Sequence, residues 1–261
     1  MSDKDVVLYE ISNYVATVTL NRPDRRNALN VAAFKRLEEI WKDINKNPKV
    51  RVAILTGSDC GTFCAGMDLK ETAEIRAKQG IDILELIGDP SCPIMRDVKK
   101  PIIAAMNGHA PAGGMMLTIN CDLRIGLAGS TLGITEVHRG RGSAWAMPAM
   151  WAMPAPLLLE LTLVGDFMPV ERFHQVGFVN YIEPTAAKVL ERARALASRI
   201  AEGAPLSVEA AKLSARAAMD IVTGHAIKEA TQIHEKAYQS EDAIEGPRAF
   251  AEKRKPVWKG R

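Results

Sequence analysis

The sequence lacks the signals of several protein classes. It has four cysteines in 261 residues, and only Cys60 and Cys64 are close together. A lone Cys-x-x-x-Cys without partner histidines does not predict zinc, so we expect no metal. No segment approaches the roughly 18 apolar residues of a membrane span, so we expect no membrane association. Residues 1–10 lack the apolar core of a secretion signal, and we expect a cytoplasmic protein with reduced thiols.

A strong excess of one charge is also missing. The chain has 34 basic and 31 acidic side chains, a net charge of +3. This balance gives no reason to expect nucleic acid as a partner, although a local basic patch can still meet an anionic ligand. Hydrophobic residues make up 47% of the chain, enough for the core of one large domain without disulfides or metal.

The first half of the sequence predicts alternating strands and helices. Short apolar runs predict strands at 14–20, 50–55, 101–106 and 123–128. Asn30 can cap a helix, a second helix is expected over 68–87 with an interruption at Gly80, and a short one at 114–120. Repeated strand-then-helix units favour an α/β layered fold.

The second half changes character and reads as helical from Thr185 onward. One amphipathic helix is expected up to Ile200, a second begins at Pro205, a third covers 224–240, and a short one lies near 245–255. We therefore expect a core with the functional site at 1–184. Residues 185–261 are expected to form a helical region that packs on its own core or reaches a neighbouring subunit.

Two loops carry the clearest functional signal. They are 61–69 (GTFCAGMDL) and 107–117 (NGHAPAGGMML), and each follows a short apolar run. Small residues leave backbone N–H groups uncovered. One N–H from each loop can donate a hydrogen bond to an oxygen that becomes negative during a reaction. The loops thus predict a site that stabilises an enolate or a tetrahedral oxyanion.

With their surroundings, these loops resemble the crotonase superfamily, the enoyl-CoA hydratase/isomerase family. The match includes Asn-Arg-Pro at 21–23, Asn-Ala-Leu-Asn at 27–30, Cys-Asp-Leu-Arg-Ile at 121–125, and the segment 245–256. The resemblance implies a spiral of ββα turns followed by a helical trimerisation region, with trimers often paired into hexamers. It also implies acyl-CoA thioesters as ligands, with coenzyme A as part of the substrate and no other cofactor.

The same resemblance assigns roles to individual residues. The backbone N–H groups of Met67 and Gly113 would be the oxyanion donors, aided by the start of a short helix at Gly113. The positions assigned to CoA binding are Arg26, Ala28, Leu29, Ala65, Asp68, Leu69, Lys70, Phe250 and Lys253. The last two match positions that reach a neighbour's ligand. From the residues alone, the solvated end of a helix is the better interpretation of Lys253.

The acids of the chain depart from the pattern of ordinary hydratases. Hydratases of the family generally carry two glutamates that hold a water between them. Here the later one is present as Glu136, whereas the earlier position holds Met116. Methionine cannot orient or deprotonate water, and it makes that side of the pocket drier. A single glutamate suits double-bond isomerisation or a non-standard hydration, and hydroxycinnamoyl-CoA hydratase-lyases have a similar pattern. Met116 can also simply be a core residue or line the acyl pocket.

Several alternatives stay open at this point. His138 follows Glu136 by two residues, so in an extended segment both would face one way, and it can be a second acid or base or a solvent-facing residue. The repeated Trp-Ala-Met-Pro at 145–148 and 151–154 can form an acyl-pocket wall or a subunit contact. The alternative functions are a specialised acyl-CoA hydrolase or C–C lyase, and a non-catalytic CoA-binding subunit.

Overall fold

Two β-sheets form the framework of the protein. The computed structural model describes residues 5–261, except for the side chains of 222–226. The larger sheet has the strand order β1-β2-β3-β4-β6-β9 and is parallel apart from the β1–β2 pair. Its strands are Val7–Ser12 (β1), Val15–Leu20 (β2), Val52–Gly57 (β3), Ile102–Met106 (β4), Leu123–Leu127 (β6) and Tyr181–Glu183 (β9). The smaller sheet, in the order β5-β7-β8, consists of Ala110–Pro111 (β5), Thr131–Gly133 (β7) and Met168–Pro169 (β8).

Helices alternate with these strands, as the sequence predicted for an α/β fold. The α-helices are Val31–Lys46 (α1), Leu69–Gln79 (α2), Leu84–Ile87 (α3), Pro93–Arg96 (α4), Gly113–Asn120 (α5), Ala155–Val164 (α6), Val170–Gln175 (α7), Ala186–Glu202 (α8), Pro205–Tyr238 (α9) and Glu241–Ala251 (α10). The 3₁₀ helices are Pro23–Arg25 (η1), Glu136–Arg139 (η2) and Ala144–Trp151 (η3). The expected cap of α1 is present, because the Asn30 side chain accepts a hydrogen bond from the N–H of Ala33 at 2.9 Å.

The central strands are buried on both faces. Alternate residues of β3 and β4 point to opposite sides of the sheet. Ala53 and Leu55 belong to the main core, which also contains the apolar stripe of α1. Val52 and Ile54 belong instead to a second core beneath α8. Since each fully buried large apolar side chain contributes roughly 1.5–3 kcal/mol, these two layers hold β3 and β4 firmly in place. The loops that follow both strands therefore start from a rigid base.

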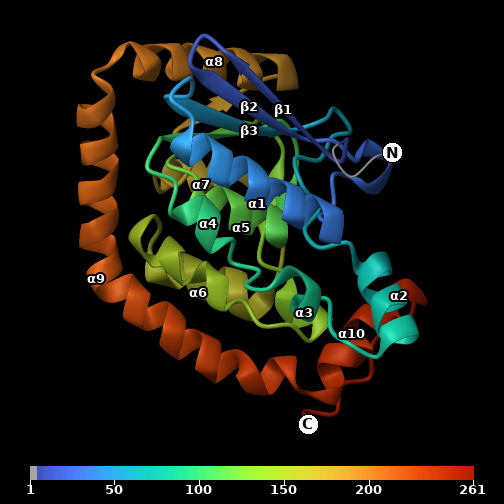
Figure 1. The fold of residues 1–261 in the computed structure, drawn as a ribbon. Helices are drawn as coiled ribbons and strands as arrows, with labels where there is room; N and C mark the ends of the chain where they lie inside the picture. Colours follow the sequence, from blue (N-terminus) through green and yellow to red (C-terminus); the bar gives the residue numbers. More distant parts are fainter. Residues whose placement is uncertain (1–4) are drawn as a thin grey trace.

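The helical end differs from the sequence prediction in two respects. A break was expected between a helix starting at Pro205 and another at 224–240, but α9 is one continuous helix of 34 residues. Pro205 occupies its first turn, as predicted. Figure 1 shows α9 running along one side of the molecule from α8 to α10, and α10 lying beside α2. The last helix begins at Glu241, capped by Ser240, four residues earlier than expected.

Some large apolar side chains remain on the surface of this single chain. Leu206, Ile221 and Ile233 of α9 are 70–82% exposed, and Leu163 of α6 is 73% exposed. The trimer or hexamer expected from the sequence stays a prediction. No helix in the described part of the chain combines the length and apolar character needed to cross a bilayer.

Candidate active site

The two small-residue loops run side by side in the structure. Thr62 and His109 form a parallel β-bridge, and the Phe63 N–H donates to the His109 carbonyl oxygen at 2.9 Å. The approach leaves no room for side chains at the contact. A Cβ atom on Gly114 would lie 2.2 Å from the Cys64 carbonyl oxygen. The glycine is therefore required by the closeness of the two backbones.

The backbones of Met67 and Gly113 lie close together, one in each loop. A Cβ atom on Gly113 would lie 3.5 Å from the Met67 nitrogen. In the described part of the chain neither N–H donates to a protein acceptor. Gly113 is the first residue of α5, where helix geometry leaves N–H groups unpaired and the helix dipole is positive. Together the two groups can donate to one negative oxygen.

Backbone strain accompanies this arrangement at Ala112. Its φ of 50° is a left-handed value that residues with a Cβ rarely adopt. Its N–H donates to the carbonyl oxygen of Gly133 at 2.8 Å, which ties the loop to strand β7. Such strain costs about 1–3 kcal/mol and persists only where the surroundings enforce it. Here it directs the chain into α5 with the Gly113 N–H uncovered.

The smaller sheet brings Glu136 to the same place. Strands β5 and β7 are parallel, with Ala110 opposite Leu132. The carboxyl ends of both strands therefore lie at the same edge of the smaller sheet. Gly113 comes shortly after β5 and Glu136 shortly after β7, so both residues lie near this edge. Glu136 is the first residue of η2.

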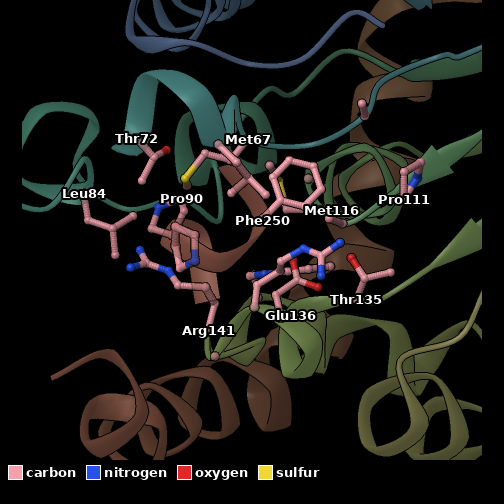
Figure 2. A pocket seen from close by; sticks show the side chains of 18 of the residues that line it. Met67, Thr72, Leu84, Pro90, Pro111, Met116, Thr135, Glu136, Arg141 and Phe250 are labelled. Carbon is pink, nitrogen blue, oxygen red and sulfur yellow. The ribbon is translucent and has the colours of Figure 1, made fainter. Parts of the chain in front are cut away.

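These groups line one cavity of about 270 Å³. Figure 2 shows Met67 and Glu136 on opposite sides of it, with Met116 and Phe250 between them in the view. Of the described residues that line the cavity, Glu136 is the only acid. Most of the remaining wall is apolar, so a ligand placed here would be largely withdrawn from water.

Burial controls the protonation of Glu136. It raises the pKa of this carboxyl group from 4.5 to about 8, because the charged form loses hydration. Backbone N–H groups of Glu136 and Thr135, and after them the charges of Arg141 and Arg139, oppose the rise without cancelling it. The Glu136 Oε2 atom is buried and has no hydrogen-bond partner among the described residues. Near pH 7 most molecules therefore carry a protonated Glu136 that can donate a proton, and the ionised fraction is an unusually strong carboxylate base.

The residues assigned to CoA binding differ in where the structure places them. Arg26, Ala65 and Leu69 line the cavity. Lys70 and Lys253 are exposed and do not line it, although either can still meet a charged ligand at the surface.

Three further assigned residues belong to the framework beneath the cavity. Asp68 is buried, caps the start of α2 and forms an ion pair with Arg22 at 2.9 Å. Ala28 and Leu29 are also buried, and Leu29 forms a β-bridge with Met67. Backbone hydrogen bonds of Leu29 with Gly66 and Asp68 support the Met67 loop, and none of the three assigned residues lines the cavity.

Phe250 lines the cavity of its own chain. The sequence had led us to expect that it contacts the ligand of a neighbouring subunit. The reason is the close packing of α10 on η2. A Cβ atom on Gly246 would lie 2.0 Å from the Arg139 carbonyl oxygen. This contact holds the Phe250 ring over the cavity within one chain.

Two local expectations are corrected by 3₁₀ geometry. Residues 136–139 form a 3₁₀ turn, so His138 and Glu136 do not share a face as they would in an extended strand. His138 is exposed and does not line the cavity, which removes the geometric basis for its role as a second acid or base. The two copies of the Trp-Ala-Met-Pro repeat also have different surroundings, because η3 contains the first copy and ends at the first residue of the second. Trp145 lines the cavity, whereas Trp151 is 51% exposed and lies in a separate groove beside α9.

Several cavity residues were missed by sequence reasoning. Arg139 and Arg141 line the wall next to Glu136, and Tyr238 reaches it from α9. The basic motif His-Arg-Gly-Arg at 138–141 was visible only as a departure from the family pattern. For Tyr238 the sequence offered no signal, because its hydroxyl group donates to the carbonyl oxygen of Gly142, 96 positions away in the chain.

Comparisons with known proteins agree with the fold. A family model described as enoyl-CoA hydratase/isomerase matches residues 10–261. The chain therefore belongs to the enoyl-CoA hydratase/isomerase family and is an enzyme of the hydratase or isomerase type. The resemblance read from the sequence is confirmed.

Individual relatives cover almost the whole chain. An (E)-benzylidenesuccinyl-CoA hydratase of Thauera aromatica is 36% identical over 97% of this chain and 99% of its own. A carnitinyl-CoA dehydratase of Proteus mirabilis is 33% identical over 95% of each chain. The crystal structure of a carnitinyl-CoA hydratase from Mycobacterium avium aligns with a TM-score of 0.84 and 34% identity, covering 99% of this chain and 100% of that one. The crotonase fold with a C-terminal helical region is thus confirmed.

Proposed function

We propose that this enzyme adds water to, or removes it from, the double bond of an enoyl-CoA thioester, with Glu136 as its one proton-transfer group. The observation that carries the proposal is that a single acid shares a cavity with the uncovered N–H groups of Met67 and Gly113. The names of the relatives, which include hydratases and dehydratases, support addition or removal of water as the reaction.

The oxyanion donors would act on the thioester carbonyl. When a nucleophile adds to the β-carbon, electrons move onto the carbonyl oxygen and give an enolate. The N–H groups of Met67 and Gly113 would hold that oxygen, and each donor of this kind is worth about 100- to 1,000-fold in rate. The same donors polarise the substrate in the reverse reaction, in which loss of the α-proton generates the enolate.

Glu136 would move the protons. One oxygen of its carboxyl group gives a proton to the α-carbon, while the other takes a proton from the water that adds to the β-carbon. The carboxyl group is regenerated, so one acid suffices for hydration. In the reverse direction the ionised group accepts the α-proton, and its raised pKa makes it a strong base for this step.

Double-bond isomerisation is the second candidate, because it also needs only one group that moves a proton between two carbons. Met116 favours it, since no second acid stands there to hold a water. Product analysis separates the two reactions. A 2-enoyl-CoA should give a 3-hydroxyacyl-CoA if the enzyme hydrates, and only a 3-enoyl-CoA if it isomerises.

Proton transfer by Glu136 can be tested without knowing the substrate. A saturated acyl-CoA incubated in D₂O should exchange its α-proton, as detected by mass spectrometry. Glu136→Gln should lower the exchange rate about 100- to 10,000-fold. The matched control is Glu74→Gln, an exposed α2 residue outside the cavity, and it should exchange at the wild-type rate. Undiminished exchange in Glu136→Gln would rule out Glu136 as the base.

A further inference from the structure

Two arginines beside Glu136 have no part in the proposed reaction. Arg139 ends η2, and Arg141 follows two residues later. Both line the cavity. Arginine in a largely apolar wall is costly unless an anion accompanies it, so each guanidinium group should have an identifiable partner.

Arg141 has such a partner within the chain. Its guanidinium group forms two hydrogen bonds with the Asp82 carboxylate, at 2.6 and 3.0 Å. It also lies over the Tyr238 ring, 5.4 Å from the ring centre. The arginine side chain is 9% exposed, and the ion pair holds the Asp82 pKa below its usual value. The charge of Arg141 is therefore balanced and its position fixed; Figure 2 shows its side chain extending toward Leu84.

Arg139 lacks a comparable partner. Its guanidinium group lies over the Phe250 ring at 4.7 Å from the ring centre, and one N–H donates to the His138 carbonyl oxygen at 3.0 Å. In the described part of the chain no carboxylate forms an ion pair with it. Partial burial lowers the pKa of Arg139, which reflects the cost of withdrawing its charge from water. An anionic group of a ligand would offset that cost.

The turn geometry places this arginine near the reacting carbons. In a 3₁₀ helix residues three apart lie on the same side, so Arg139 and Glu136 share a face of η2. The cation of the cavity that is assigned to the nucleotide, Arg26, comes instead from the loop after η1. An anion at Arg139 would thus belong to the acyl group, which must lie beside Glu136 for proton transfer.

We propose that the preferred acyl group carries a second carboxylate, which Arg139 binds. The substrate class is then the mono-CoA thioester of an unsaturated dicarboxylic acid. The apolar wall formed by Phe34, Leu84 and Trp145 would hold the hydrocarbon part. This inference rests on the proposed function, because it places the thioester carbonyl at Met67 and Gly113.

A binding experiment tests the inference independently of turnover. Isothermal titration calorimetry would compare saturated thioesters of equal chain length with and without a terminal carboxylate: succinyl- with butyryl-CoA, glutaryl- with pentanoyl-CoA, and adipyl- with hexanoyl-CoA. A charge-assisted hydrogen bond predicts about 10- to 100-fold tighter binding of at least one dicarboxylic member over its neutral counterpart. Arg139→Gln should abolish that preference, and Arg139→Lys should retain part of it.

The matched control is Arg194→Gln. Arg194 is an exposed arginine of α8 outside the cavity, so its removal should leave the preference unchanged. Free CoA is the other control, because a phosphate is the competing anion. If Arg139→Gln weakens free CoA and every thioester equally, Arg139 binds a phosphate and the inference is wrong.

Two more outcomes are decisive. Wild-type enzyme that binds each neutral thioester as tightly as its dicarboxylic counterpart would overturn the inference while leaving hydration of neutral enoyl-CoAs intact. A carboxylate preference that depends on Arg139 would support it even if Glu136→Gln retained full proton exchange. That second result would reject the proposed function alone.

Discussion

The proton on Glu136 should link the stability of this enzyme to pH. Burial raises the pKa of Glu136 from 4.5 in its ordinary surroundings to about 8 in the folded protein. At about 1.36 kcal/mol for each pKa unit, the difference corresponds to an upper bound of about 5 kcal/mol. Because the folded state holds this proton more tightly, the contribution is fully present below pH 4.5. It is lost progressively as the pH rises toward 8.

Glu136→Gln removes the group that must ionise. Near pH 5 the variant and the wild type should have similar free energies of unfolding, since a neutral carboxyl group and an amide have similar size and polarity. At pH 9 the variant should be more stable, by several kcal/mol if little water enters the cavity and by less if the cavity relaxes. The gain comes only from avoiding a buried charge.

Urea unfolding at pH 5, 7 and 9 measures the effect, with Glu74→Gln as the exposed control. The control should show no pH-dependent difference from the wild type. Equal stability of Glu136→Gln and wild type at all three pH values would refute the claim that Glu136 is buried in its charged form at high pH. The reaction rates should follow the same titration of Glu136. Hydration needs the protonated form, so its rate should decline above about pH 8. Removal of the α-proton needs the ionised form, so its rate should increase as the pH rises toward 8.

Substitutions at three other positions test the site and the fold around it. Met116→Glu should raise the rate of crotonyl-CoA hydration about tenfold or more, whereas Met116→Gln should not, and an unchanged rate would contradict the argument that the missing acid limits hydration. Gly113→Ala should lower turnover about 100-fold while the protein stays folded, because its Cβ would lie 3.0 Å from the Gly66 Cα and displace one donor; wild-type activity would exclude the Gly113 N–H from the site. Asn27→Ala should destabilise the fold by about 3 kcal/mol in urea unfolding, because the buried side chain donates to the carbonyl oxygens of Ser58 and Thr62 at 2.9 and 2.8 Å. Asn27→Gly should lose about 1 kcal/mol less, since the φ of 55° at this position strains alanine; equal losses would show that strain is unimportant there.

Local structure could be predicted where the signal lies within a few residues. The Asn30 cap, the end of α2 at Gly80 and the Pro205 start of α9 all follow from local backbone rules. The predicted break before 224 was wrong. One glycine costs a helix about 1 kcal/mol, and the surrounding helix-forming residues of α9 outweigh that cost.

The site could be predicted in part, because motif spacing identifies loops but not the direction of each side chain. Met67, Gly113 and Glu136 line the cavity as expected. Asp68 belongs to the same motif as Met67, yet it turns inward to cap α2 and pair with Arg22. Its ion pair joins residues 46 positions apart, and only the folded chain brings such partners together.

Two features together set the charge in the cavity: position 116 holds methionine and not an acid, and arginines follow Glu136. The charge of Arg139 favours the ionised form of Glu136 and so opposes the effect of burial. A carboxylate bound to Arg139 would neutralise that influence and raise the pKa of Glu136 further. The acid would then be protonated when the substrate is in place, which is the form that hydration requires. A second glutamate at position 116 would bring another negative charge into the same cavity and weaken binding of such a substrate. The methionine therefore fits an enzyme whose substrate, and not its protein, supplies the second carboxylate.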